Sequence, residues 1–171
     1  MLKKFRNFFR VLKSILWDPG NQAVIIYRFG HWLYTRPGFV QRLLYVPYIL
    51  MQRRMKWKWG IEIVAQATIG PGFHVFHYGG IFIGAAIIGK NFAVTQNVVI
   101  GTRGEDDGVP HIGDNVSVSP GANVSGAISI GNNVRIGPNA VVTKNIPDDA
   151  LVHSVPPQVV VFPGRYGPPD T

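Results

Sequence analysis

Aliphatic residues recur every six positions along the second part of this chain. One residue is inserted between Ile81 and Ile88, and the step from Ile100 to Ile112 covers two whole units. A period of six matches neither the 3.6-residue turn of an amphipathic helix nor the two-residue alternation of a simple strand. Thirteen positions follow the spacing, on two phases: Ile63, Ile69, Val75, Ile81, Ile88, Val94, Ile100, Ile112, Val118, Val124, Ile130, Ile136 and Val142.

The six-residue period predicts a triangular solenoid in which each hexapeptide forms one short strand and one corner. Three hexapeptides then close a coil of about eighteen residues, with the periodic aliphatic side chain in the interior. Glycine follows the aliphatic residue at positions 70, 89, 101, 113, 131 and 137, where it relieves crowding at the turn. The pattern therefore predicts a mainly β fold, a left-handed parallel β-helix.

A different pattern precedes the repeats. Apolar residues at helical spacing and cations on the other face predict a basic amphipathic helix over residues 2–17. Two further helices are expected over residues 22–34 and 41–59, the latter broken or kinked at Pro47. The expected organisation is a basic helical region at 1–60, the β-helix at 61–147 and a proline-rich cap and tail at 148–171.

Charge is distributed unevenly between these parts. The chain carries a formal net charge of +8, but residues 1–60 hold twelve Lys and Arg against one acid, so the basic character belongs to the helical region. An anionic membrane surface bound through residues 1–17 is one expected partner, and a helix that packs on its own protein is the alternative. We expect no nucleic-acid partner, no transmembrane segment and no signal peptide, and hence a cytoplasmic protein. If residues 1–17 bind a membrane, the protein is peripheral at the membrane's inner face.

Three local motifs go beyond the repeat. The segments Gly60-Ile61-Glu62-Ile63 and His77-Tyr78-Gly79-Gly80, with the loop ending at His111, resemble the serine O-acetyltransferase branch of the hexapeptide acyltransferases. The similarity covers roughly residues 17–160. It implies acetyl transfer from acetyl-CoA, and a base must then take the proton of the attacking hydroxyl. A neutral imidazole suits that task, which makes His77 the candidate general base.

Glu62 and His111 complete the candidate catalytic set. Glu62 lies fifteen positions before His77, close to one coil, so its carboxylate is expected to orient the imidazole and stabilise the imidazolium. The resemblance implies that His111 lines the acceptor pocket. It also implies Asp immediately before the first histidine and Arg before the second in serine-specific enzymes. Phe76 and Pro110 occupy these places instead.

Those two departures, together with a short helical region, favour a different acceptor. Phe76 and Tyr78 offer an aromatic surface that suits a sugar ring, so we expect a glycan hydroxyl, as in capsule and exopolysaccharide O-acetyltransferases of the colanic-acid type. The resemblance further implies a homotrimer with acetyl-CoA in a groove between two chains and with His77 and His111 supplied by neighbouring chains. The residues matched to cofactor binding are Thr102, Pro120, Pro138 and Lys144.

Three alternatives remain open on the sequence. Serine acetylation in cysteine biosynthesis is the nearest one. A zinc enzyme of the γ-carbonic anhydrase kind needs three converging histidines, and His74, His77 and His111 are too sparse for that, so no metal is expected. A non-catalytic β-helix scaffold is the third alternative, although a scaffold has no need to pair Glu62 with His77. The absence of cysteine excludes disulfides and a thiol nucleophile.

Overall fold

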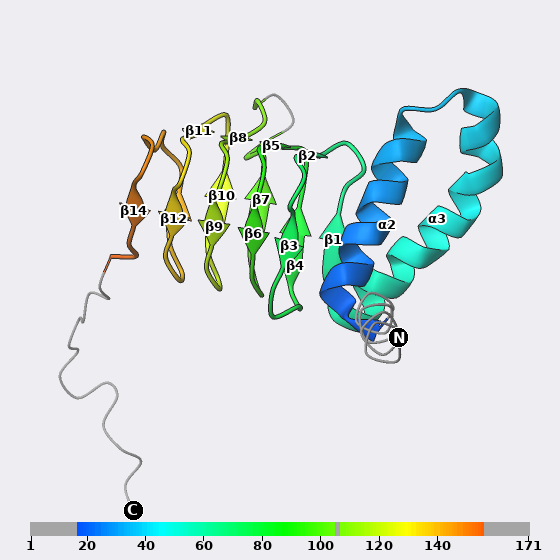
Figure 1. The fold of residues 1–171 in the computed structure, drawn as a ribbon, viewed down its shortest axis with the longest axis horizontal. Helices are drawn as coiled ribbons and strands as arrows, with labels where there is room; N and C mark the ends of the chain where they lie inside the picture. Colours follow the sequence, from blue (N-terminus) through cyan, green and yellow to red (C-terminus); the bar gives the residue numbers. More distant parts are fainter. Residues whose placement is uncertain (1–16, 105–106, 156–171) are drawn as a thin grey trace, which may run out of the picture.

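A computed structural model describes residues 17–104 and 107–155, and it consists of a helical hairpin followed by a stack of β-coils (Figure 1). Helix α2 (Pro19–Tyr34) and helix α3 (Gly38–Trp59) form the hairpin at one end of the stack. Nearly all of the expected amphipathic helix at 2–17 lies outside the described residues. Within the described part of the chain, neither helix is long and apolar enough to cross a membrane.

The coils form three parallel sheets with the topology of the predicted left-handed β-helix of about five turns. Sheet A has the order β1-β4-β7-β10-β13, sheet B the order β11-β8-β5-β2, and sheet C the order β14-β12-β9-β6-β3. The chain thus visits A, B and C in turn and then starts the next coil. The strands are β1 (Ile61–Ile63), β2 (Thr68–Ile69), β3 (His74–Val75), β4 (Ile81–Ile83), β5 (Ile87–Ile88), β6 (Ala93–Val94), β7 (Val99–Gly101), β8 (His111–Ile112), β9 (Ser117–Val118), β10 (Asn123–Ser125), β11 (Ser129–Ile130), β12 (Arg135–Ile136), β13 (Val141–Val142) and β14 (Leu151–Val152).

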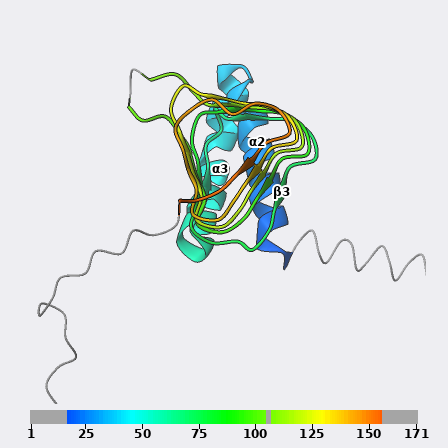
Figure 2. The same ribbon diagram turned by 90° about the vertical axis from the view of Figure 1, so that its left-hand side faces the viewer.

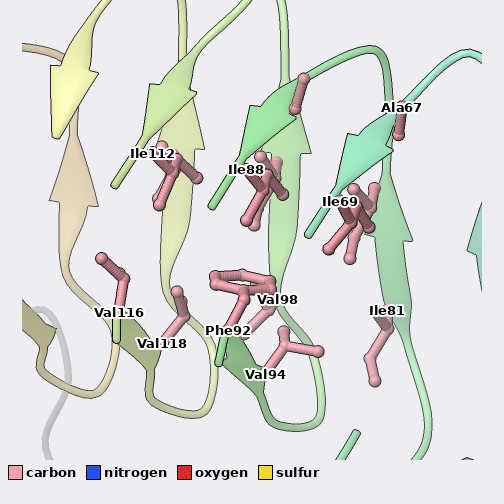
Figure 3. Packing of buried hydrophobic residues seen from close by; sticks show 14 of the residues in the cluster. Ala67, Ile69, Ile81, Ile88, Phe92, Val94, Val98, Ile112, Val116 and Val118 are labelled. Atoms are coloured by element: carbon pink, nitrogen blue, oxygen red, sulfur yellow. The ribbon is translucent and has the colours of Figure 1, made fainter. Parts of the chain in front are cut away.

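The periodic aliphatic side chains fill the interior of the coils, as the sequence predicts (Figure 3). Twelve of the thirteen are buried, and Val75 is partly buried against the same core. Small apolar residues at the corners, such as Ala67 and Val98, are also buried. The hydrophobic effect on this continuous column of side chains is what drives the short strands to stack, because two-residue strands have few hydrogen bonds of their own.

The register departs from the expected spacing in one place. Ile63 pairs with Ile83, twenty positions later, and Ile83 pairs with Ile100, seventeen positions later. The isoleucine that continues the column on sheet A is therefore Ile83, and the expectation of Ile81 there is corrected. Two additional residues sit in the corner between Val75 and β4, and one residue is missing after Ile83. The first coil thus bulges at the corner that carries His77.

Asparagine side chains stack along the corner between sheets B and C. The side-chain amide of Asn91 donates a hydrogen bond to the side-chain oxygen of Asn115, and Asn115 donates in the same way to Asn133. Asn133 donates to the carboxylate of Asp149, and the donor–acceptor distances are 2.8–2.9 Å. All four residues have positive φ, a conformation that asparagine and aspartate tolerate better than most L-residues. The ladder satisfies the polar side chains of these corners and ties successive coils together.

The helical hairpin covers the open edge of the first coil. Strand β2 is the edge of sheet B, and the Tyr27 hydroxyl donates to the Ala67 carbonyl at 2.8 Å while accepting from the Ile69 N–H at 3.0 Å. The guanidinium of Arg28 donates to the Ile69 carbonyl, and the His31 ring lies 2.9 Å from the Ala65 carbonyl. These side chains replace the missing neighbouring strand. Helix α3 is continuous through Pro47, so of the predicted break or kink the break does not occur.

Candidate active site

His77 occupies the bulged corner between sheets C and A. Its backbone has φ 51°, and the glycines that follow it, Gly79 and Gly80, also have positive φ. A non-glycine residue in this region is uncommon and marks a corner whose surroundings impose its conformation. The resulting geometry leaves the His77 side chain exposed on the surface of the coil. An exposed imidazole on a rigid corner is placed to meet a substrate.

A hollow of about 490 Å³ surrounds this histidine and is lined by His77, Asp18, Tyr78 and Gln96. Asp18 caps helix α2 by accepting from the Asn21 N–H at 2.9 Å, so its carboxylate stands at the start of the hairpin. The hairpin can approach β3 closely here because Gly20 has no side chain; a Cβ there would overlap the Val75 carbonyl oxygen. The side-chain oxygen of Gln96 is buried and accepts no hydrogen bond within the described part of the chain.

Asp18 and Gln96 are two residues that the sequence analysis missed. Gln96 follows Val94 by two positions, just as His77 follows Val75, and Val75 pairs with Val94. The coil register therefore carries the signal for Gln96. Asp18 has no such signal, because its position beside the corner depends on how the hairpin packs on the coils.

Glu62 is placed on the outer side of β1, where it pairs in register with Phe82. Its carboxylate lies 2.7 Å from the Lys56 ammonium and lines a second cavity, of about 340 Å³, between the hairpin and the first coil. Burial, followed by the nearby Tyr45 and Glu62, raises the pKa of Tyr48 in the same cavity. Among residues 17–104 and 107–155, Glu62 forms no hydrogen bond with His77, so their pairing stays a prediction.

His111 begins strand β8 on sheet B, directly after the excursion between β7 and β8. Its side chain is exposed, and its N–H donates to the Ile128 carbonyl at 2.8 Å. An ion pair of 3.5 Å between Arg103 and Asp107 holds the described part of the excursion. Figure 2 shows the excursion leaving one corner of the triangular outline. That corner joins sheets A and B, whereas His77 lies where C meets A, so one chain does not bring the two histidines together.

The cofactor candidates divide between the same two corners. Val75, Val94, Val118 and Ile136 are in register, and the residues two positions after them, His77, Gln96, Pro120 and Pro138, form one column along the C–A corner. Thr102 and Lys144 lie along the A–B corner. Thr102 lines a groove of about 580 Å³ on the outer face of sheet A together with Val99, Arg103 and Ser125, among others.

The two aromatic candidates flank His77 but already have partners. Tyr78 packs edge-to-face with Trp59 at 4.9 Å between ring centroids and lines the His77 hollow. Phe76 is exposed and stacks on His74 at 5.8 Å. Pro110 is buried and its carbonyl accepts from the Ile87 N–H at 3.0 Å, which gives it a structural place at the entry to β8. No group of three metal-ligating side chains occurs among the residues that the structure describes.

Comparison with known proteins identifies the repeat and the relatives. Residues 110–144 match the family profile "Bacterial transferase hexapeptide (six repeats)". Serine acetyltransferase of Synechococcus elongatus is 37% identical over 163 residues, covering 93% of this chain and 64% of the relative. The Bacillus subtilis serine acetyltransferase is 35% identical over 164 residues, covering 94% and 71%. A putative colanic acid biosynthesis acetyltransferase of Escherichia coli is 34% identical over 134 residues, covering 75% and 83%.

Solved structures give the same result. A serine acetyltransferase in complex with CoA aligns with a TM-score of 0.70 and 27% identity, over 86% of this chain and 60% of that one. The Neisseria gonorrhoeae serine acetyltransferase in complex with serine aligns with a TM-score of 0.71 and 29% identity, over 84% and 58%. The chain therefore spans less than two thirds of the first relative and of both structures.

These findings correct the expected acceptor. The serine acetyltransferases above match over more than nine-tenths of this chain, the colanic acid relative over three quarters, and the aligned structures are serine acetyltransferases. A sugar acceptor and a place in polysaccharide synthesis were inferred from Phe76 and Pro110, which precede the two histidines in sequence, and from the short helical region. That inference was wrong because it judged the acceptor mainly from the one residue that precedes each histidine. The hollow at His77 is also lined by Asp18 and Gln96, which come from other parts of the chain.

Proposed function

Because this chain belongs to the hexapeptide-repeat acyltransferase family, we propose that it transfers the acetyl group of acetyl-CoA to the hydroxyl of serine. The observation that carries the proposal is the hollow at the bulged corner, where His77 is joined by Asp18 and Gln96. There the His77 imidazole can accept the proton of the serine hydroxyl, and the Asp18 carboxylate can pair with the serine ammonium.

The reaction follows from these groups. The neutral His77 imidazole accepts the serine hydroxyl proton as the oxygen attacks the thioester carbonyl. The tetrahedral oxyanion then collapses, the carbon–sulfur bond breaks, and the CoA thiolate takes the proton back from the imidazolium. The products are O-acetylserine and CoA. Glu62 is proposed to orient the imidazole. The Asp18 carboxylate supplies, from another element, the negative charge that Phe76 does not offer to the substrate ammonium.

A complete site of this kind calls for a second chain. One corner carries His77 with Pro120 and Pro138, and another carries Thr102, Lys144 and the excursion that ends at His111. Two β-helices side by side in a homotrimer place the first corner of one chain opposite the second corner of its neighbour. Acetyl-CoA would lie in the groove between them, with Lys144 available to its phosphates, and His111 would reach the acceptor from the neighbouring chain.

The test is acetyl-CoA turnover, measured by thiol release with serine as acceptor and with O-acetylserine identified by mass spectrometry. We expect His77→Ala to lower kcat by about a hundredfold or more, since general-base catalysis contributes that much. His153→Ala is the matched control, because His153 is exposed at the far end of the coils beyond β14. Absence of serine turnover by the wild-type protein, or equal rates in wild type and His77→Ala, would overturn the proposal.

A further inference from the structure

Helix α3 is apolar on two opposite faces, and only one of them is used for packing. Tyr48 and Met55 are buried against the rest of the protein. At 100° per residue, a second apolar row runs along the opposite side of the helix. Its members are exposed to 60–81%: Phe39, Leu43, Val46, Leu50 and Trp57. The row runs nearly the full length of the helix, and nothing in the described part of the chain covers it.

Cations border this apolar row on both sides. Arg42 and Arg53 fall on one side at helical spacing, and Arg54 and Lys58 on the other, and all four are exposed. The helix contains no acidic residue. Towards its end, a shallow hollow of about 420 Å³ is lined by Leu50, Trp57 and three of these cations, Arg53, Arg54 and Lys58. We define the apolar row and these four cations as the α3 outer face.

We propose that the α3 outer face docks on an anionic lipid bilayer, with its apolar row at the level of the acyl chains and its cations among the headgroup phosphates. An exposed apolar row bordered by Lys and Arg and including tryptophan is the arrangement that lies in a membrane interface. The long cationic side chains can reach outward to phosphates while their stems cover apolar surface. The hollow between Arg53 and Arg54 is suited to a headgroup phosphate.

Charge decides against a second copy of the chain as the occupant. Two α3 outer faces brought together would bury eight cations against one another with no acidic residue on either helix to neutralise them. An anionic bilayer removes that repulsion. Trp17 is also exposed, and it directly precedes α2, which places a second exposed tryptophan at the end of the hairpin where α3 finishes.

The experiment is co-sedimentation of the full chain with vesicles of phosphatidylcholine alone or with 30% phosphatidylglycerol. We expect binding to the anionic vesicles only, weakened at least tenfold by the double substitution Leu43→Glu and Leu50→Glu and several-fold by Arg53→Gln with Arg54→Gln. Leu151→Glu is the matched control, because it places the same charge on an exposed leucine at the opposite end of the coils (Figure 1). Thermal unfolding and serine acetylation should be unchanged in all three variants.

Three outcomes would overturn the proposal. One is equal binding by the wild type and the Leu43→Glu, Leu50→Glu variant. Another is binding that is lost only when Lys3, Lys4 and Arg6 are replaced by Gln, which would assign the lipid contact to the first residues of the chain. The third is absence of vesicle binding together with a larger assembly in sedimentation velocity that the glutamates dissociate, which would identify a second copy as the occupant. Since the vesicle assay does not use acetyl-CoA, failure here is distinguishable from failure of the proposed activity.

Discussion

The Lys56 ammonium lies 2.7 Å from the Glu62 carboxylate, and this ion pair joins the last turns of helix α3 to the first strand of the coils. Both side chains are partly open to solvent, so the pair contributes less than about 1 kcal/mol to stability. Glu62 nevertheless has a second proposed role, the orientation of His77. The two roles can be separated because Lys56 takes part in only one of them.

We therefore expect Glu62→Gln to lower kcat for serine acetylation about tenfold or more, because the amide cannot stabilise the imidazolium as a carboxylate does. Lys56→Gln should keep kcat within about twofold and the free energy of unfolding within about 1 kcal/mol. Steady-state kinetics and urea unfolding of both variants supply the test. An equal loss of kcat in the two would show that Glu62 serves only as a tie between helix and coil.

Tyr27 should be a major determinant of stability, because its hydroxyl replaces a neighbouring strand at the edge of sheet B. Tyr27→Phe removes the acceptor of the Ile69 N–H and the donor to the Ala67 carbonyl, and leaves both buried. We expect the free energy of unfolding to fall by about 1–3 kcal/mol. The exposed Tyr34, changed to Phe, is the control and should be neutral in urea unfolding. Equal stabilities of the two variants would contradict the capping role.

The same tyrosine predicts a loss of stability in alkali. Burial raises the pKa of Tyr27, against smaller opposing effects of its hydrogen bond with Ile69 and of Arg28. The unfolded chain then releases this proton at lower pH than the folded chain does. Its contribution is therefore fully present below the unfolded pKa of about 10 and is lost as pH rises through the folded pKa. Unfolding free energies at pH 9 and 11 should converge between wild type and Tyr27→Phe, and a constant gap would refute this.

The asparagine ladder offers a test that separates hydrogen bonding from backbone conformation. Asn115 has φ 58° and links Asn91 to Asn133. The Asn115→Gly variant loses both side-chain hydrogen bonds but adopts positive φ without strain. In the Asn115→Ala variant the left-handed backbone conformation lowers stability by about 1–2 kcal/mol more. We expect stability to fall in the order wild type, glycine, alanine, as measured by thermal unfolding. An alanine variant as stable as the glycine variant would mean that the corner relaxes.

Complementation tests whether the two corners combine across chains. His77→Ala and His111→Ala should each have little activity alone. In randomly mixed trimers, about a quarter of the shared sites would combine an intact His77 from one variant with an intact His111 from the other. Co-expression should therefore restore about a quarter of the wild-type rate. A single-chain site gives no recovery on mixing, and that result would refute a shared site.

Much of the fold was predictable because the core is a single column of side chains that repeats along the axis of the coils. Each inward position follows from the previous one, so spacing alone identified Ile88, Val94 and the regular coils that follow. The bulge at His77 was not visible in the same way, since Ile81 and Ile83 are both buried isoleucines and counting by six selects Ile81. Only the pairing of Ile83 with Ile63 and Ile100 distinguishes them.

The site was less predictable than the fold for a related reason. Gln96 could have been placed by counting one coil from His77, but Asp18 reaches the same hollow through the packing of a helix that has no repeat. The acceptor was predicted wrongly because Phe76 and Pro110 were considered only as the residues that precede His77 and His111 in sequence. When side chains from different elements form one site, no local sequence pattern indicates that they lie close together.

The excursion between β7 and β8 has a consequence for how such chains diversify. Val94 pairs with Val118, twenty-four positions later, whereas Val118 pairs with Ile136 after eighteen. The excursion therefore adds one whole repeat to its coil and leaves every later side chain on its original face. The additional residues at the His77 corner also leave the later coils in register, although they are not a multiple of six. The segment before His111 can therefore differ in length and composition while the column of aliphatic residues beneath it stays the same.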